Sequence, residues 1–196
     1  MDNYAPVLIT TLNRTTHLKK CIKSLQKNPM SVDTDLYIYL DYPLKEDHYE
    51  GYFKTLSYLN KGIDGFHSVN IIKREQNYGF LRNQRCAMKD IFLKYDCVIR
   101  TNDDSEFSPN FLESINKGLS IYKEDESVLA ILGYAYPIEW NVSKDATAIK
   151  QSFVCSEWGI GYWREKYLKI ENILKNKYFI KSFTNNQKKH KYKQLI

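Results

Sequence analysis

Short, mostly apolar runs alternate with longer amphipathic stretches along the first two thirds of the chain. Apolar runs bounded by turn residues are typical of buried strands. They occupy residues 7–11, 35–40, 69–72, 97–100 and 128–132. Between them, apolar residues recur at helical spacing and predict helices over about 15–27, 48–60, 80–94 and 111–122.

Two of these helices carry apolar stripes that we expect to pack against the sheet. The first stripe consists of Tyr49, Tyr52, Phe53, Leu56 and Leu59. The second consists of Leu81, Met88, Ile91, Phe92 and Tyr95. Strands that alternate with helices of this length pair in parallel through right-handed crossovers. The sequence therefore predicts an α/β fold in three layers, α/β/α, around a mostly parallel central sheet.

Polar residues follow the strands at the points where each strand ends. Asn13 follows the first strand, Asp41 the second, Gly79 the third, and the pair Asp103-Asp104 the fourth. In open parallel sheets, ligands bind beyond the carboxyl ends of the strands. We therefore expect these residues to gather at one edge of the sheet and to form a binding site there.

The residue types at this edge suit a nucleotide diphosphate. Mg²⁺ and Mn²⁺ are commonly held by one or two carboxylates together with substrate phosphates, which fits Asp103-Asp104. Asn13 and Asp41 offer hydrogen bonds to a base or ribose, while Gly79 opens a helix whose N-terminus favours an anion. Each feature also has a plainer interpretation, because Asp pairs and glycines are ordinary turn residues.

Charge is spread unevenly over the 196 residues, whose net charge is +6. Residues 163–196 hold ten Lys or Arg and two Glu, a net charge of +8, which leaves −2 for residues 1–162. This contrast predicts a folded domain over 1–162 and a helix with a basic tail over 163–196. A near-neutral body argues against nucleic-acid binding. The tail is either solvated or a weak contact to anionic lipid at the membrane periphery.

The chain contains no apolar run long enough to span a membrane, and its first residues lack the pattern of a signal peptide, so we expect none. Its four cysteines are scattered and lack the spacing of a zinc site. Together these features predict a reduced, cytoplasmic protein.

Five segments, in this order, resemble nucleotide-sugar-dependent glycosyltransferases of the GT-A fold. APVLITTLNRTTHLKKCIKSL resembles their first strand and helix, and LYIYLDYP resembles their second strand with its nucleotide-contacting Asp. REQNYGFLRNQRCAMKDIF resembles the segment before the metal motif. TNDDSEFSPNFLESI resembles the metal motif of the N-acetylglucosaminyltransferase I-like branch, and CSEWGIGYWREKY resembles the acceptor-side segment. The resemblance covers about residues 5–168.

The resemblance implies a role for each matching residue. Asp104 would bind Mn²⁺ or Mg²⁺, Asp103 would lie near the ribose and donor sugar, and Asp41 would read the base. The remaining nucleotide-sugar contacts would come from Thr10, Asn13, Arg14, Gly79 and Arg82. The acceptor side would comprise Ser156, Glu157, Trp158 and Gly159. The implied substrates are a UDP- or GDP-sugar donor and a glycan, polysaccharide, lipopolysaccharide or lipid-linked acceptor.

Two departures from the family pattern concern catalysis. Asn102 stands where the family has an acid, which removes one charge from the metal motif. The catalytic base expected after the acceptor segment has no counterpart, because no Asp or Glu follows Glu171. Glu157 is the candidate base, although it is equally a candidate structural partner for Arg164.

The alternative function is a catalytically impaired or shortened domain that binds a nucleotide or a partner without transfer. A nucleotidyltransferase is disfavoured, because no glycine-rich phosphate loop lies near the N-terminus.

Overall fold

The computed structural model describes residues 4–135, 139, 143, 146, 148–150 and 157–175. The first half contains β1 (Val7–Thr11), α1 (Thr15–Gln26), the 3-10 helix η1 (Pro29–Asp33), β2 (Asp35–Leu40), α2 (Glu46–Asn60) and β3 (Ser68–Lys73). The second half contains α3 (Phe80–Phe92), β4 (Cys97–Asn102), α4 (Phe111–Ile121), β5 (Ile131–Leu132), β6 (Ile160–Trp163) and α5 (Arg164–Lys175). Of the predicted basic tail, residues 176–196 lie outside the described residues.

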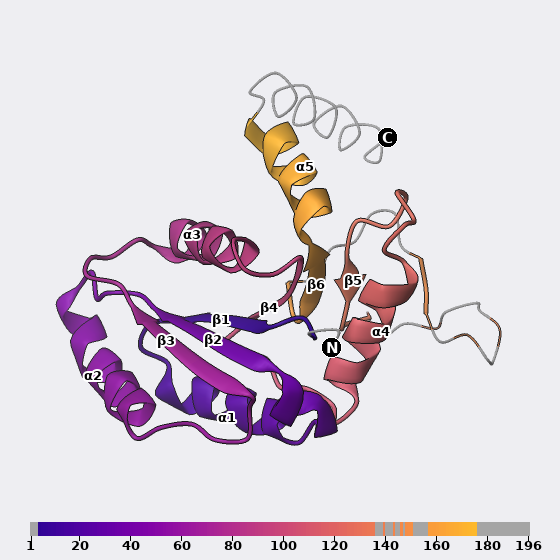
Figure 1. Ribbon diagram of the computed structural model, residues 1–196. Helices are drawn as coiled ribbons and strands as arrows, with labels where there is room; N and C mark the ends of the chain where they lie inside the picture. Colours follow the sequence, from indigo (N-terminus) through magenta and orange to yellow (C-terminus); the bar gives the residue numbers. More distant parts are fainter. Residues whose placement is uncertain are drawn as a thin grey trace, which may run out of the picture.

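The strands form one sheet in the order β3-β2-β1-β4-β6-β5. The four strands from β3 to β4 are parallel, whereas β6 is antiparallel to both β4 and β5. Figure 1 shows the helices arranged on both sides of this sheet. The predicted three-layer α/β fold with a mostly parallel sheet is confirmed. The fifth predicted strand is shorter than expected, and β6 was not predicted.

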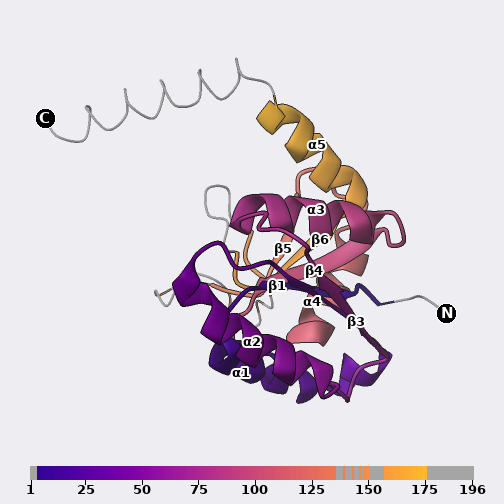
Figure 2. The same cartoon turned by 90° about the vertical axis from the view of Figure 1, so that its left-hand side faces the viewer.

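Alternating side chains of β1 divide the interior into two cores. Val7 and Ile9 point into a core with α1, α2 and α4, while Leu8 points into a second core beneath α3. Figure 2 shows α1 and α2 on the side of the sheet opposite α3. Thr10 and Thr11 continue this alternation, so the last two residues of β1 face different layers.

The two predicted apolar stripes are only partly buried. Tyr52 and Leu59 are buried in α2, but Phe53 is 58% exposed. In α3, Leu81 is 63% exposed and does not face inward as predicted. Leu81 lies in the first turn of α3, where the buried residues are the polar Asn83 and Gln84. Helical spacing identified both helices but overestimated the width of their buried faces.

A buried lysine joins helix α5 to the loop between α4 and β5. Lys166 is 5% exposed, and its ammonium donates hydrogen bonds to the carbonyl oxygens of Tyr122, Asp125 and Val128 at 3.1, 2.8 and 2.9 Å. The ammonium also lies 4.0 Å from the centre of the Trp163 ring. The first turn of α5 therefore holds the loop between α4 and β5. Among the described residues, no helix has the length and apolar character needed to cross a membrane.

Asp35 joins the start of β2 to the start of β3 and to Tyr95, in the segment between α3 and β4, and is expected to make stability depend on pH. Burial pushes its pKa upward, but hydrogen bonds from Ser68, His67 and Tyr95 outweigh this and hold the pKa below its usual value. A lowered pKa contributes stability that is present above the unfolded pKa and is lost as the pH falls through the folded one. Asp35→Asn should cost about 1 kcal/mol at pH 7.

Thermal unfolding measured from pH 7 down to about 3 checks this expectation. The melting temperatures of Asp35→Asn and wild type should converge as the pH falls, because the wild type loses its own contribution. Asp33→Asn is the matched control, since Asp33 lies two residues away and is exposed. A constant difference between Asp35→Asn and wild type over this range would contradict the assignment.

Candidate active site

A cleft of about 340 Å³ opens at the carboxyl ends of β1, β2 and β4. Predicted nucleotide-sugar residues line it, namely Thr10, Asn13, Arg14, Asp41, Gly79 and Asp103. Residues without a predicted nucleotide-sugar contact also line it, namely Thr11, Leu12, Leu44, His48, Asn77, Phe80, Asn83 and Asn102. His48 and Phe80 lie in the first turns of α2 and α3. Leu12, Leu44 and Asn77 lie in the segments that follow β1, β2 and β3, and this position is a signal readable in the sequence.

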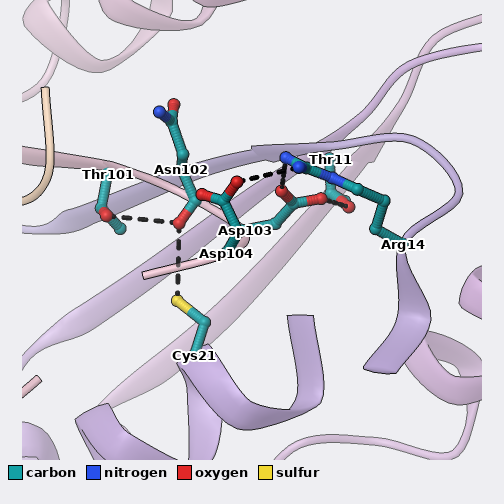
Figure 3. Close-up of polar contacts among 7 residues, drawn as sticks. All are labelled: Thr11, Arg14, Cys21, Thr101, Asn102, Asp103 and Asp104. Carbon is teal, nitrogen blue, oxygen red and sulfur yellow. Dashed lines mark hydrogen bonds and ion pairs between the residues drawn. The ribbon is translucent and has the colours of Figure 1, made fainter. Parts of the chain in front are cut away.

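An arginine bridges the two adjacent carboxylates (Figure 3). Nη1 of Arg14 donates to Oδ2 of Asp104 at 2.8 Å, and Nη2 pairs with Oδ1 of Asp103. Thr11 donates its hydroxyl to the other carboxylate oxygen of Asp103 at 2.6 Å. The side chain of Asp103 is 2% exposed, that of Asp104 is 37% exposed, and that of Arg14 is 49% exposed. The pair thus consists of one buried and one accessible carboxylate.

The alternation of β4 explains this geometry. Asp103 follows the strand on the α1 side, where Thr11 and Cys21 also lie, whereas Asn102 projects to the other side. Burial raises the pKa of Asp103, and the Thr11 hydroxyl and Arg14 guanidinium partly offset this increase. Burial also raises the pKa of the Cys21 thiol beneath the pair. Cys21 is therefore a neutral packing residue and not a nucleophile.

Asp41 holds the loop that leads into α3. Its two carboxylate oxygens accept backbone N–H hydrogen bonds from Tyr78 and Gly79, both at 2.9 Å, and the side chain is buried. Gly79 has φ +72°, a left-handed conformation that favours glycine. Asp41 therefore positions the N-terminus of α3 at the cleft. Base recognition by Asp41 stays a prediction.

Arg82 lies on the first turn of α3, outside the residues that line the cleft. Its guanidinium stacks over the Tyr78 ring at 4.4 Å, in an exposed position. The predicted donor contact of Arg82 stays a prediction.

The loop that carries Asn13 rests directly on the backbone of α2. A Cβ atom added at Gly51 would lie 2.4 Å from the carbonyl oxygen of Asn13, which is closer than any real contact. Nearby, the Thr55 hydroxyl donates to the Gly51 carbonyl at 2.9 Å and lies 2.8 Å from the Thr15 hydroxyl. Gly51 therefore permits the close approach that places Asn13 and Arg14 at the cleft. Nothing local in the sequence marks this glycine.

Glu157 pairs with an arginine other than the expected one. Its Oε1 lies 3.4 Å from Nη2 of Arg100, a β4 side chain that is 6% exposed, while Glu157 is half-exposed. Arg164, the alternative partner considered for Glu157, instead pairs with Asp96 and donates to the carbonyl of Phe92. The buried guanidinium places the Glu157 carboxylate near the end of the sheet where β4 and β6 meet.

The other acceptor-side residues are described in part. Trp158 is half-exposed, and its ring lies 4.9 Å from that of Tyr134. Gly159 has φ +75° and approaches the Phe111 ring. Ser156 lies outside the described residues.

The carboxylate pair fits a hard divalent cation. The described residues contain no group of three or more His, Cys, Asp or Glu side chains able to hold a metal ion. A site built from one or two carboxylates, completed by phosphates and water, needs no such group and is the pattern common for Mg²⁺ and Mn²⁺. The accessible carboxylate of Asp104 supplies oxygen ligands of the right kind.

Comparison with solved structures places the fold among glycosyltransferases. Residues 1–349 of S. aureus TarS match with a TM-score of 0.57 and 15% identity, covering 87% of this chain and 49% of that one. The mannosyltransferase PcManGT from Pyrobaculum calidifontis, in complex with GDP-Man and Mn²⁺, matches with a TM-score of 0.53 and 10% identity, covering 85% and 47%. This chain thus spans about half the length of each. The sequence matches no family model and no curated protein. The two solved structures are GT-A glycosyltransferases, and this chain has the GT-A fold.

Proposed function

We propose that this chain is a metal-dependent glycosyltransferase that moves a sugar from a UDP- or GDP-sugar to a glycan, polysaccharide or lipopolysaccharide acceptor. The observation that carries the proposal is the cleft at the ends of β1, β2 and β4, which Arg14 and the buried Asp103 line. The accessible Asp104 is not among the lining residues, but it follows Asp103 in the chain and pairs with the same Arg14. A complex of PcManGT with GDP-Man and Mn²⁺ shows that a protein of this fold takes such a donor and ion.

Each candidate residue would contact a different part of the donor. Thr10, Asn13 and Asp41 would contact the base and ribose, and Asp103 would lie near the ribose and the sugar. Asp104 would hold Mn²⁺ or Mg²⁺, which when bound neutralises the diphosphate and makes it a better leaving group. The positive end of α3, which begins after Gly79, favours the same negative charge.

Glu157 is the proposed base. Its half-exposed carboxylate would accept the proton of the acceptor hydroxyl as that oxygen forms a bond to the anomeric carbon. The bond between the anomeric carbon and the diphosphate oxygen breaks in the same step, and the nucleoside diphosphate leaves. The buried Arg100 would hold Glu157 in place.

The proposed location rests on two features of the sequence. The scattered cysteines favour a reduced, cytoplasmic protein, and the strongly basic C-terminal region favours weak peripheral contact to anionic lipid. A lipid-linked acceptor would be consistent with that contact. Nucleic acid is not a proposed partner.

A screen of nucleotides tests the proposal. Purified chain is heated with UDP, GDP, ADP or CMP, each with and without millimolar Mn²⁺, and the melting temperature is recorded. We expect UDP or GDP with Mn²⁺ to raise it by roughly 5–10 °C at about 100 times Kd. Sugar-nucleotide hydrolysis or transfer is then measured with the nucleotide that binds. A chain stabilised by no nucleotide would refute the proposed function, while binding without turnover would favour a non-catalytic domain.

A further inference from the structure

The guanidinium of Arg14 lies where a cation between the two carboxylates would lie (Figure 3). One nitrogen contacts Asp104 and the other contacts Asp103, so a single positive group serves both carboxylates. We propose that Arg14 and a divalent cation compete for Asp104, and that Arg14 moves to the donor diphosphate once the cation is held. This inference rests on the proposed function and assigns Arg14 a second role within it.

Charge explains why the two cations exclude each other. Asp103 is 2% exposed, and a buried carboxylate needs a countercharge close by. Arg14 provides this countercharge in the structure described here. A divalent ion bound to Asp104 within a few ångströms of the guanidinium would be repelled by it, because like charges interact strongly at short range in a partly desolvated cleft. Therefore the Arg14 guanidinium and the divalent ion cannot both stay bound to Asp104.

The structure favours Arg14 as the group that moves. Its side chain is half-exposed and extends from the residue just before α1, whereas Asp103 is fixed by the Thr11 hydroxyl. Arg14 also lines the cleft, so its guanidinium remains there when it leaves Asp104. The planar guanidinium donates paired hydrogen bonds to phosphate as readily as to carboxylate. A diphosphate in the cleft would thus replace the partner that Arg14 gives up.

This exchange predicts cooperative binding. The cation alone must displace Arg14 without a substitute partner for it, so its affinity should be low. A nucleoside diphosphate supplies that partner, so each ligand should raise the affinity for the other by the same factor.

Binding of Mn²⁺ alone to the full chain tests the competition directly. Free Mn²⁺ is quantified by electron paramagnetic resonance in titrations of wild type, Arg14→Gln, Arg14→Lys and Lys20→Gln. Arg14→Gln should bind Mn²⁺ about tenfold more tightly than wild type, since nothing competes for Asp104. Arg14→Lys keeps the charge but cannot bridge both carboxylates and should fall between the two. Lys20→Gln is the charge-matched control, because Lys20 pairs with the exposed Glu106 at 3.7 Å and not with Asp103 or Asp104.

The same titrations are repeated with saturating UDP and GDP. The gain in Mn²⁺ affinity caused by the nucleotide should be about tenfold smaller in Arg14→Gln than in wild type, because the transfer of Arg14 to the diphosphate is lost. The inference would be overturned if Arg14→Gln bound Mn²⁺ alone no more tightly than wild type does. It would also be overturned if Lys20→Gln raised the affinity for Mn²⁺ alone as much as Arg14→Gln does. If Arg14→Gln binds Mn²⁺ more tightly but no protein binds a nucleotide, the competition stands and the proposed donor is wrong.

Discussion

Asp104→Asn is expected to abolish the stabilisation that Mn²⁺ and the matching nucleoside diphosphate together give the wild-type chain. Ligand at about 100 times Kd contributes roughly 2.7 kcal/mol to the free energy of unfolding, and this contribution should disappear almost entirely. Asparagine retains the shape of the side chain but removes the negative charge on which a hard cation depends. Thermal unfolding with and without both ligands provides the measurement.

The partial exposure of Asp104 separates an effect on ligand binding from an effect on the stability of the ligand-free chain. Its side chain is 37% exposed, so the substitution leaves no buried charge without a partner, and Arg14 can still pair with Asp103. The ligand-free variant should therefore melt within about 2 °C of wild type, as expected of an exposed substitution. Glu106→Gln, an acid two residues along the chain that is 62% exposed, controls for loss of charge near the cleft. Full ligand stabilisation of Asp104→Asn would show that Asp104 is not the metal ligand.

Lys166→Met is expected to produce the largest loss of stability among the substitutions considered. It removes the ammonium that serves three backbone carbonyls while retaining most of the apolar stem. Hydrogen bonds from a charged donor and the unsatisfied carbonyls left behind together cost about 3 kcal/mol. For a chain of this length, the melting temperature should fall by roughly 6–12 °C.

Lys169→Met is the matched control on the same helix. Lys169 pairs with Glu126 at 2.9 Å, but both side chains are more than half-exposed. An exposed ion pair contributes at most about 1 kcal/mol, so the melting temperature should change little. Similar losses for the two variants would mean that burial of Lys166 against the loop between α4 and β5 does not stabilise the fold.

The local pattern of apolar residues was sufficient to predict the strands of the parallel part of the sheet. Residues 7–11 and 35–40 were predicted as strands with the bounds that β1 and β2 have, because both are almost wholly buried. Strand β6 was missed, since its four residues include a glycine and show no polar alternation. Its strand conformation depends on antiparallel pairing with β4, which lies about sixty residues earlier. Such a pairing leaves no signal in a short window of sequence.

Part of the lining of the cleft could be predicted from the sequence, but Arg82, Asp104 and Glu157 are not among the lining residues, and the contacts could not be predicted. The rule that ligands bind beyond the ends of parallel strands brought Asn13, Asp41 and Asp103 together correctly at one cleft. It did not show that Asp41 binds the backbone of Tyr78 and Gly79, or that Glu157 pairs with Arg100. These partners are separated by tens of residues, and their side-chain directions depend on the finished packing.

The close approach of Gly51 to Asn13 links the shape of the cleft to a residue of α2 that does not line it. Glycine inside a helix costs about 1 kcal/mol relative to alanine, so α2 gives up stability at this position. In return, the loop with Asn13 and Arg14 occupies space that a methyl group at position 51 would fill. A side chain at position 51 would therefore displace residues that line the cleft, although Gly51 itself is not among them. Position 51 is a place where one substitution should change the shape of the cleft while every lining side chain stays the same.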